Sequence, residues 1–167
     1  MLVLFCCVMN DTPDVDAQAA LDEKHMRSAL EEARLAALSG EVPVGCVITQ
    51  GERVIARAAN RTIADRDPTA HAEMVALRAT AAAVGNHRLA GLTLHVTIEP
   101  CAMCAGAMVQ ARIDRLVYGA DDPKGGAVRS CFAIFDHTQV NHRVAVTSGV
   151  LADDAAALLR DFFAARR

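Results

Sequence analysis

The stretch DPTAHAEMVAL, residues 67–77, opens a predicted helix that carries two reactive side chains, His71 and Glu73. A helix turns by about 200° over two residues, so these side chains would point apart if both lay inside it. Pro68 restricts the backbone ahead of them and favours an abrupt entry into the helix. We therefore expect His71 at the very start of the helix or just before it.

Apolar periodicity and turn residues on either side of this stretch predict alternating helices and strands. The expected helices are 22–39, a helix after His71 whose apolar face runs from Met74 to Val84, 100–112 and 151–162. The expected strands are 44–50, 53–59, 92–98, 115–120 and 143–149. Gly51 and Glu52 are the predicted two-residue turn between the first two strands. This order predicts an α/β domain whose mixed five-stranded sheet is covered by helices on both faces.

The composition fits one globular domain, because 53% of the 167 residues are hydrophobic and 22% are charged. Residues 1–20 have an apolar start and an acidic stretch without periodicity, so we expect a disordered tail before a single domain of residues 21–167. No apolar run approaches the roughly 20 residues of a membrane span, and no signal peptide is recognisable. We therefore expect a cytoplasmic protein with no membrane partner.

The net charge of −3 comes from this acidic N-terminal stretch, since acids and bases balance in residues 21–167. A neutral domain neither indicates nor excludes a local basic patch for nucleic acid. Six cysteines are few for a disulfide scaffold in a chain of this length, so reduced or metal-bound thiols are expected.

Cys101 and Cys104 form a C-x-x-C motif at the start of a predicted helix. One helical turn places both sulfurs on the same side, and the helix N-terminus favours the thiolate form. Alone, the motif has three interpretations: a redox dithiol, half of a structural zinc site, or a helix with incidental cysteines.

His71 favours a metal site, because it begins one predicted helix and Cys101 begins the next. Two successive crossovers therefore bring His71, Cys101 and Cys104 to one end of the sheet, where open α/β sheets bind ligands. Three protein ligands match a catalytic zinc with an open position for water. No fourth ligand is evident, since Cys46 lies in an apolar strand and Cys131 has no cysteine nearby.

Glu73 supplies the remaining group that such a site needs. A carboxylate beside a metal-activated water can take a proton from it and deliver that proton to a substrate atom. H-x-E followed by P-C-x-x-C is the signature of the zinc-dependent nucleobase deaminases. Here the two halves are His71-Ala72-Glu73 and Pro100-Cys101-Ala102-Met103-Cys104.

The chain also resembles the bacterial tRNA-specific adenosine deaminases over residues 22–167. The resemblance includes EVPVG (41–45), NRTIADRDPTAHAEMVALR (60–78), TIEPCAMCAGAM (97–108) and GADDPKGGA (119–127). It implies a three-layer α/β/α cytidine deaminase-like fold, a homodimer and one zinc ion per subunit. The implied reaction is hydrolytic conversion of the wobble adenosine to inosine in the anticodon stem-loop of an arginine tRNA.

The resemblance also implies residue roles: zinc binding by His71, Cys101 and Cys104, proton transfer by Glu73, and contacts to the flipped base or its ribose by Asn60, the Ala72 backbone and Asn141. Asn60 has an alternative role as a turn or capping residue.

Phosphate contacts are expected from surface arginines, among them Arg61, Arg66, Arg129 and Arg143. Residues 125–139 are less similar to the family than their flanks, and Arg129 stands where a small residue is expected. RNA contacts in this loop are therefore expected to differ from those of the family.

Two other functions remain open. The first is deamination of a free base or nucleoside, such as guanine or cytosine, with the same zinc site. The second is a non-catalytic, zinc-stabilised RNA-binding module. Glu73 argues against the second, because a structural site needs no general acid or base.

Overall fold

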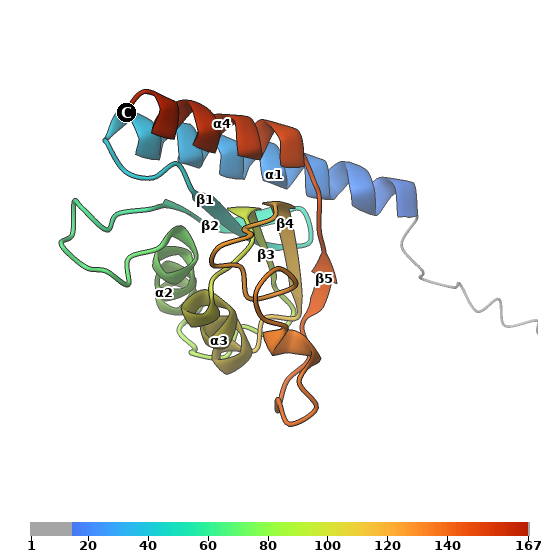
Figure 1. The fold of residues 1–167 in the computed structure, drawn as a ribbon. Coiled ribbons are helices and arrows are strands. Elements are labelled where there is room, and N and C mark those ends of the chain that lie inside the picture. Colours follow the sequence, from blue (N-terminus) through green and yellow to red (C-terminus); the bar gives the residue numbers. More distant parts are fainter. Residues whose placement is uncertain (1–14, 167) are drawn as a thin grey trace, which may run out of the picture.

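The computed structural model describes residues 15–166, which fold around a five-stranded mixed sheet (Figure 1). The strands are β1 (Gly45–Gln50), β2 (Arg53–Ala59), β3 (Thr93–Ile98), β4 (Arg115–Ala120) and β5 (Ala145–Thr147). Their order across the sheet is β2-β1-β3-β4-β5. β1 is antiparallel to both β2 and β3, whereas β3, β4 and β5 run parallel.

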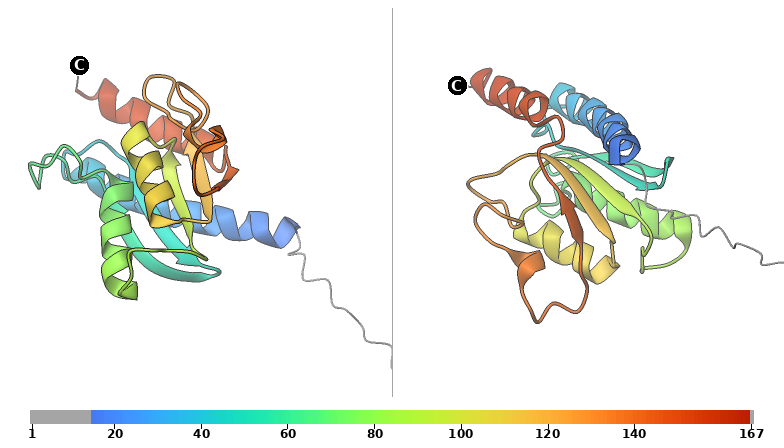
Figure 2. Two further views of the ribbon diagram at one scale, coloured as in Figure 1. Left: turned by 90° about the horizontal axis from the view of Figure 1, so that it is seen from below. Right: turned by 90° about the vertical axis from the view of Figure 1, so that its right-hand side faces the viewer.

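Two helices cover each face of the sheet, so the predicted three-layer α/β/α architecture is confirmed (Figures 1 and 2). One face carries α1 (Val15–Leu38) and α4 (Ala152–Ala164), and the other carries α2 (Ala72–Val84) and α3 (Ala102–Ala111). With both faces covered, β1 is buried over its first five residues. A methyl group on Gly45 would lie 1.9 Å from the carbonyl oxygen of Ala29 in α1, so this close approach requires glycine.

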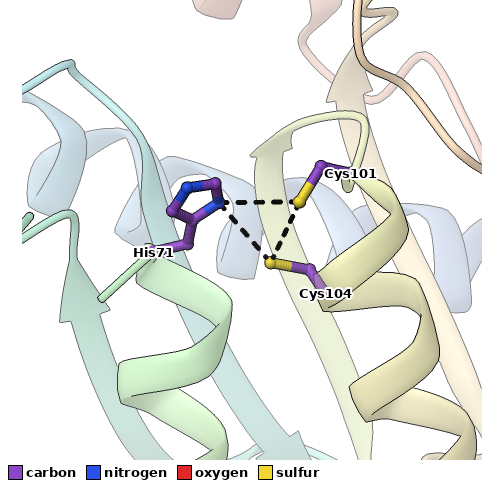
Figure 3. Close-up of side chains that lie close together, drawn as sticks. All are labelled: His71, Cys101 and Cys104. Atoms are coloured by element: carbon purple, nitrogen blue, oxygen red, sulfur yellow. Dashed lines mark hydrogen bonds between the residues drawn. The ribbon is translucent and has the colours of Figure 1, made fainter. Parts of the chain in front are cut away.

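The predicted hairpin is confirmed, with Gly51 and Glu52 between β1 and β2 and a backbone φ of +55° at Gly51. β3 leads almost directly into α3, and β4 returns parallel to β3. The loop after β2 leads into α2. As a result, the N-termini of α2 and α3 lie side by side (Figure 3).

Two elements have clearly different boundaries from the sequence-based expectation, and one short helix was not expected. Helix α1 begins at Val15, so residues 15–20, which were expected in the tail, are helical; the rest of the expected tail lies outside the described residues. This segment is rich in alanine, which favours helix, and Asp16 lies in its first turn. β5 spans three residues instead of the expected 143–149, and the 3₁₀ helix η1 (Ile134–Asp136) was not predicted.

Within residues 15–166, no helix is both long enough and apolar enough to cross a bilayer.

Candidate active site

His71 and Cys101 occupy the same structural position, the N-cap of a helix. His71 precedes α2 with φ −66° and ψ 152°, and Cys101 precedes α3 with φ −73° and ψ 172°. These extended conformations are typical of N-cap residues. The expectation that His71 lies just before its helix is therefore confirmed.

The segment before His71 is held by a local turn. The Asp67 carboxylate accepts hydrogen bonds from the backbone N–H and the hydroxyl of Thr69, at 2.8 and 2.7 Å. The N–H of Ala70 donates to the carbonyl oxygen of Asp67 at 3.1 Å. Such a turn lets the chain enter α2 abruptly, as was predicted from Pro68.

His71, Cys101 and Cys104 form a nearly equilateral triangle (Figure 3). The His71 Nδ1 atom lies 3.7 Å from each sulfur, and the two sulfurs lie 3.7 Å apart. Within residues 15–166, no other group of three His, Cys, Asp or Glu side chains brings its ligand atoms together in this way. The predicted convergence of these three residues is therefore observed.

The triangle fits a tetrahedral metal ion with one position open. With zinc–sulfur bonds of about 2.3 Å and a zinc–nitrogen bond of about 2.0–2.1 Å, the ligand atoms of a tetrahedral site lie about 3.5–3.8 Å apart. The observed spacing of 3.7 Å falls in this range. One nitrogen and two sulfurs are also ligands that zinc prefers.

The electrostatics of these three side chains favour a thiolate at Cys101. Hydrogen bonds from the Cys104 thiol and from His71 lower the pKa of Cys101 to about 3. The same contacts act in the opposite sense on their partners: Cys101 raises the pKa of the Cys104 thiol and that of His71. The four cysteines within residues 15–166 are free thiols, as expected.

Glu73 lies in the first turn of α2, beside the triangle, and its side chain is buried with only 3% of the residue exposed. Burial raises the pKa of the Glu73 carboxyl, and Cys101 raises it further, while the backbone N–H of Glu73 and His71 oppose the shift. A raised pKa makes the carboxylate a stronger base, which suits a group that accepts a proton from water.

A cavity of about 470 Å³ opens onto these residues. Its polar lining includes Asn60, His71, Glu73, Asp122 and Lys124, and its apolar lining includes Val44, Ile98, Leu159 and Phe163. Its size and mixed lining are typical of sites that bind small organic groups.

Asn60 caps helix α2 from a distance. Its Oδ1 accepts a hydrogen bond from the Ala72 N–H at 2.9 Å, and its own N–H donates to the Val44 carbonyl at 3.1 Å. His71 makes no side-chain capping bond, so Asn60 satisfies an N–H that the helix leaves unpaired. The capping alternative is therefore observed, and contacts of Asn60 and Ala72 with a substrate stay predictions.

Asn141 is not among the residues that line the cavity. Its side-chain and backbone oxygens accept hydrogen bonds from Arg112, which caps the C-terminus of α3, at 2.7 and 2.9 Å. Cys101 lies at the opposite end of the same helix. A substrate contact from Asn141 stays a prediction, and Asn141 does not line the cavity of its own chain.

Of the four arginines expected to meet phosphates, three have partners within the chain. Arg61 binds Asp65, Arg129 binds Ser148, and Arg143 binds the Phe135 carbonyl. Within the described residues, Arg66 makes no side-chain hydrogen bond or ion pair. Phosphate contacts by these residues stay predictions, and those by Arg61, Arg129 and Arg143 would require exchange of an existing partner.

Sequence reasoning missed two buried carboxylates that hold the loops around the cavity. Glu41 accepts hydrogen bonds from the Ile63 and Ala64 N–H groups at 2.9 and 2.8 Å. Glu99 accepts bonds from the loop after β4. Burial opposes ionisation of Glu99, but hydrogen bonds from the Ser130 hydroxyl and nearby N–H groups lower its pKa to about 2. Glu99 could have been noticed in the sequence, because it is a charged residue directly after the apolar strand 92–98.

Comparisons with known proteins place this geometry among the deaminases. The family model described as MafB19-like deaminase matches residues 21–167. The tRNA-specific adenosine deaminase of Haemophilus influenzae is 50% identical over 151 residues, which cover 90% of this chain and 87% of that protein.

Solved structures of deaminases also superpose on the chain. A structure from a study of A-to-I editing by tRNA:A34 deaminases at the wobble position of transfer RNA has a TM-score of 0.79 and 48% identity. The match covers 81% of this chain and 99% of that one. A guanine deaminase from Nitrosomonas europaea has a TM-score of 0.71 and 27% identity, and that match covers 85% of this chain and 84% of the other.

Proposed function

We propose that this protein converts the wobble adenosine of a tRNA anticodon loop to inosine by hydrolytic deamination. The chain belongs to the MafB19-like deaminase family and to the tRNA-specific adenosine deaminases, and this supports the proposal. The observation that carries the proposal is the His71, Cys101 and Cys104 triangle with the buried Glu73 beside it. An arginine tRNA as the substrate rests on the resemblance of the sequence alone.

We assign one zinc ion per chain to His71 Nδ1, Cys101 Sγ and Cys104 Sγ. Their 3.7 Å spacing and their donor chemistry support this assignment. A zinc ion with an open fourth position lowers the pKa of water to about 7 and so supplies a nucleophile at neutral pH.

Glu73 carries the protons of the reaction. Its carboxylate accepts a proton from the water that attacks C6 of adenine and delivers a proton to N1. The carboxylate then takes the proton of the new C6 hydroxyl group and passes it to the exocyclic nitrogen. The bond from C6 to that nitrogen breaks, ammonia leaves, and the C6 carbonyl of inosine forms. Adenosine and water thus yield inosine and ammonia, and Glu73 returns to its starting state. Because Glu73 is buried, its pKa is raised, which suits a group that must take and return a proton.

The cavity receives the base after it leaves the anticodon stack. Unstacking costs a few kcal/mol and is least costly in a single-stranded loop. Oδ1 of Asn60 is occupied by Ala72, so its Nδ2 amide is the group available to hydrogen-bond the base or ribose. In this proposal the Ala72 N–H orients Asn60 for its contact with the nucleotide. Asn141 would contact the nucleotide from outside the cavity of its own chain.

A homodimer is part of this proposal, because the cavity of one chain lacks the predicted contact from Asn141. The anticodon stem-loop is the proposed partner, with Arg66 the least engaged of the predicted phosphate contacts. We also propose a cytoplasmic location, which a tRNA substrate supports.

The test compares substrate classes directly. Zinc-loaded protein is incubated with an anticodon stem-loop that carries a wobble adenosine and, separately, with free guanine, cytosine and adenosine. Ammonia release is measured in each case. The proposal expects release from the stem-loop and none from the free compounds. Release from a free compound alone would contradict it.

Guanine deamination is the second candidate, because a guanine deaminase shares this fold at 27% identity. The higher identity to the tRNA-specific enzyme, 50%, favours the first candidate. A non-catalytic module is disfavoured by the buried Glu73 beside the triangle, since burial of a carboxylate costs free energy that a structural site has no reason to incur.

A further inference from the structure

Glu99 is a buried carboxylate with no cationic partner. Only 1% of the residue is exposed, and within residues 15–166 no Lys, Arg or His side chain forms an ion pair with it. Its charge is balanced by hydrogen-bond donors of one loop, residues 122–130, which follows β4. A buried charge requires such compensation, so this arrangement constrains the loop strongly.

The donors divide between the two carboxylate oxygens. Oε1 accepts from the N–H groups of Val128, Arg129 and Ser130 at 3.0, 2.7 and 3.0 Å. Oε2 accepts from the Asp122 N–H at 3.1 Å and from the Ser130 hydroxyl. Both ends of the loop are therefore tied to a single side chain.

The middle of the loop packs against the same carboxylate. A methyl group on Gly126 would lie 2.2 Å from Oε2 of Glu99 and 2.7 Å from the Asp122 carbonyl oxygen. The Gly126 N–H donates to that Asp122 carbonyl at 2.9 Å, which closes a turn. Only glycine leaves room for the loop to lie this close to Glu99.

The loop contacts both the metal ligands and the cavity. Gly126 forms a β-bridge with Cys101, and the Ala127 N–H donates to the Pro100 carbonyl at 2.8 Å. Asp122 and Lys124 line the cavity together with His71 and Glu73. The loop is therefore one wall of the site, and it is attached to the backbone at the start of α3.

Glu99 itself has no free capacity for chemistry. Its two oxygens accept five hydrogen bonds, and it does not belong to the group of metal-ligating side chains. Glu99 also lines the cavity, but because both of its oxygens are engaged by the loop, we assign its influence on the reaction to the loop that it holds.

We propose that Glu99 is a positioning residue that holds residues 122–130 as a wall of the substrate cavity, so that Asp122 and Lys124 are placed for the incoming nucleotide before it binds. This role rests on the proposed function for its substrate. A wall that is already ordered spares the substrate the entropy cost of ordering the loop on binding. Loss of this order should therefore weaken substrate binding more than it slows the chemical step.

The test uses Glu99→Gln, which keeps the size of the side chain. The Gln oxygen replaces Oε1 and keeps the bonds from residues 128–130, while the Gln NH₂ faces the Asp122 N–H, another donor. We expect the KM for the stem-loop to rise about tenfold, the size of effect of one hydrogen bond to a charged group, with a much smaller change in kcat. Zinc content should stay at one ion per chain.

Hydrogen–deuterium exchange measures the loop without reference to activity. In Glu99→Gln, backbone amides near Asp122 should exchange faster than in the wild type, while β3 and α3 keep their protection. Glu41→Gln is the matched control, because Glu41 is also buried and holds the loop at residues 62–64. That variant should change exchange at 62–64 and not near Asp122.

Two further variants keep the experiment decisive. Ser130→Ala removes a single donor to Oε2, so it serves if Glu99→Gln does not fold, and it should raise KM by a smaller factor. Glu31→Gln changes an exposed carboxylate that pairs with Arg57 on the surface and should leave KM unchanged.

The outcomes separate this proposal from the proposed function. Unchanged exchange near Asp122 in Glu99→Gln, or faster exchange with an unchanged KM, would overturn the positioning role. A loss of zinc in proportion to activity would also overturn it. If the wild type forms no inosine from the stem-loop, the proposed function fails, and the exchange comparison alone decides whether Glu99 holds the loop.

Discussion

His71 and Cys101, 30 residues apart in the chain, are both N-cap residues, and the Nδ1 of one lies 3.7 Å from the Sγ of the other. The two helices that they begin pack against each other on one face of the sheet. Each helix N-terminus carries partial positive charge, which favours a thiolate at Cys101. The geometry of the candidate metal site thus follows from where two neighbouring helices begin.

Removal of one ligand should abolish tight zinc binding. Loss of a residue that only supports a ligand costs about 10–100-fold in metal affinity, so Cys101→Ser should cost about a hundredfold or more. Competition with a chromophoric chelator measures the affinity. The control Cys131→Ser changes an exposed thiol outside the triangle and should bind zinc like the wild type. Equal affinities for all three proteins would refute the assigned ligand set.

Metal removal should also lower stability. A ligand that binds only the folded state stabilises it by mass action, so chelation should lower the thermal midpoint of the wild type. The Cys101→Ser variant should show little change on chelation. Scanning calorimetry with and without chelator measures both effects, and identical shifts in the two proteins would show that the stabilising metal binds elsewhere.

Glu73→Gln should separate metal binding from catalysis. Gln has nearly the same size but cannot accept or deliver the reaction protons, so kcat should fall by about 10²–10⁴-fold while zinc is retained. Steady-state rates on the stem-loop and metal analysis of the same sample provide the measurement. Near-normal turnover in this variant would show that another group carries the protons.

Asn60→Ala should destabilise the start of α2. The Ala72 N–H would lose its acceptor, which should cost about 1 kcal/mol in the free energy of unfolding. Urea denaturation of the zinc-loaded protein measures this. Asn86→Ala is the matched control, because Asn86 accepts from the Arg88 N–H on the exposed surface, and it should cost less than about 0.5 kcal/mol. Equal costs would contradict the capping role.

Local features of the site could be predicted from the sequence, whereas contacts between distant residues could not. His71 at the helix start followed from the His71–Glu73 spacing and from Pro68, because caps and turns depend on neighbours in the chain. The link from Asn60 to Ala72 spans 12 residues, and that from Glu99 to Ser130 spans 31, so both depend on tertiary structure. No local pattern specifies the partner of such a residue.

The predicted boundaries of helices and strands were wrong where side-chain packing stabilises the element least. The N-terminal turns of α1 are mostly exposed, so their sequence has no apolar period to mark them as helical. Within residues 15–166, β5 lies at the edge of the sheet and pairs only with β4. It ends after three residues despite a longer apolar pattern. The interior strands and helices, which bury their side chains, were predicted closely.

His95 should make the protein sensitive to acid. Burial, assisted by the nearby His25, lowers the pKa of His95 to about 3, whereas an unfolded histidine titrates at about 6.5. Between these values the unfolded state binds a proton that the folded state does not. The free energy of unfolding should therefore fall as pH falls from about 6.5 towards 3, by up to about 1.4 kcal/mol per pH unit from this group.

The variant His95→Leu isolates this contribution. It removes the titrating ring and the contact of that ring with the Thr49 hydroxyl, so it should be less stable than the wild type at neutral pH but should lose less stability on acidification. Urea denaturation at several pH values, with zinc saturating, measures both curves. Parallel curves for the two proteins would show that His95 does not titrate in this way.

The most direct measurement of the central claim is inosine formed within RNA. One anticodon stem-loop carries its only adenosine at the wobble position, and a matched stem-loop carries it one nucleotide away. After incubation with zinc-loaded protein, the RNA is digested to nucleosides and inosine is quantified by chromatography. Our account predicts inosine from the first RNA and little from the second. No inosine from either RNA, with turnover of free guanine by the same preparation, would contradict it.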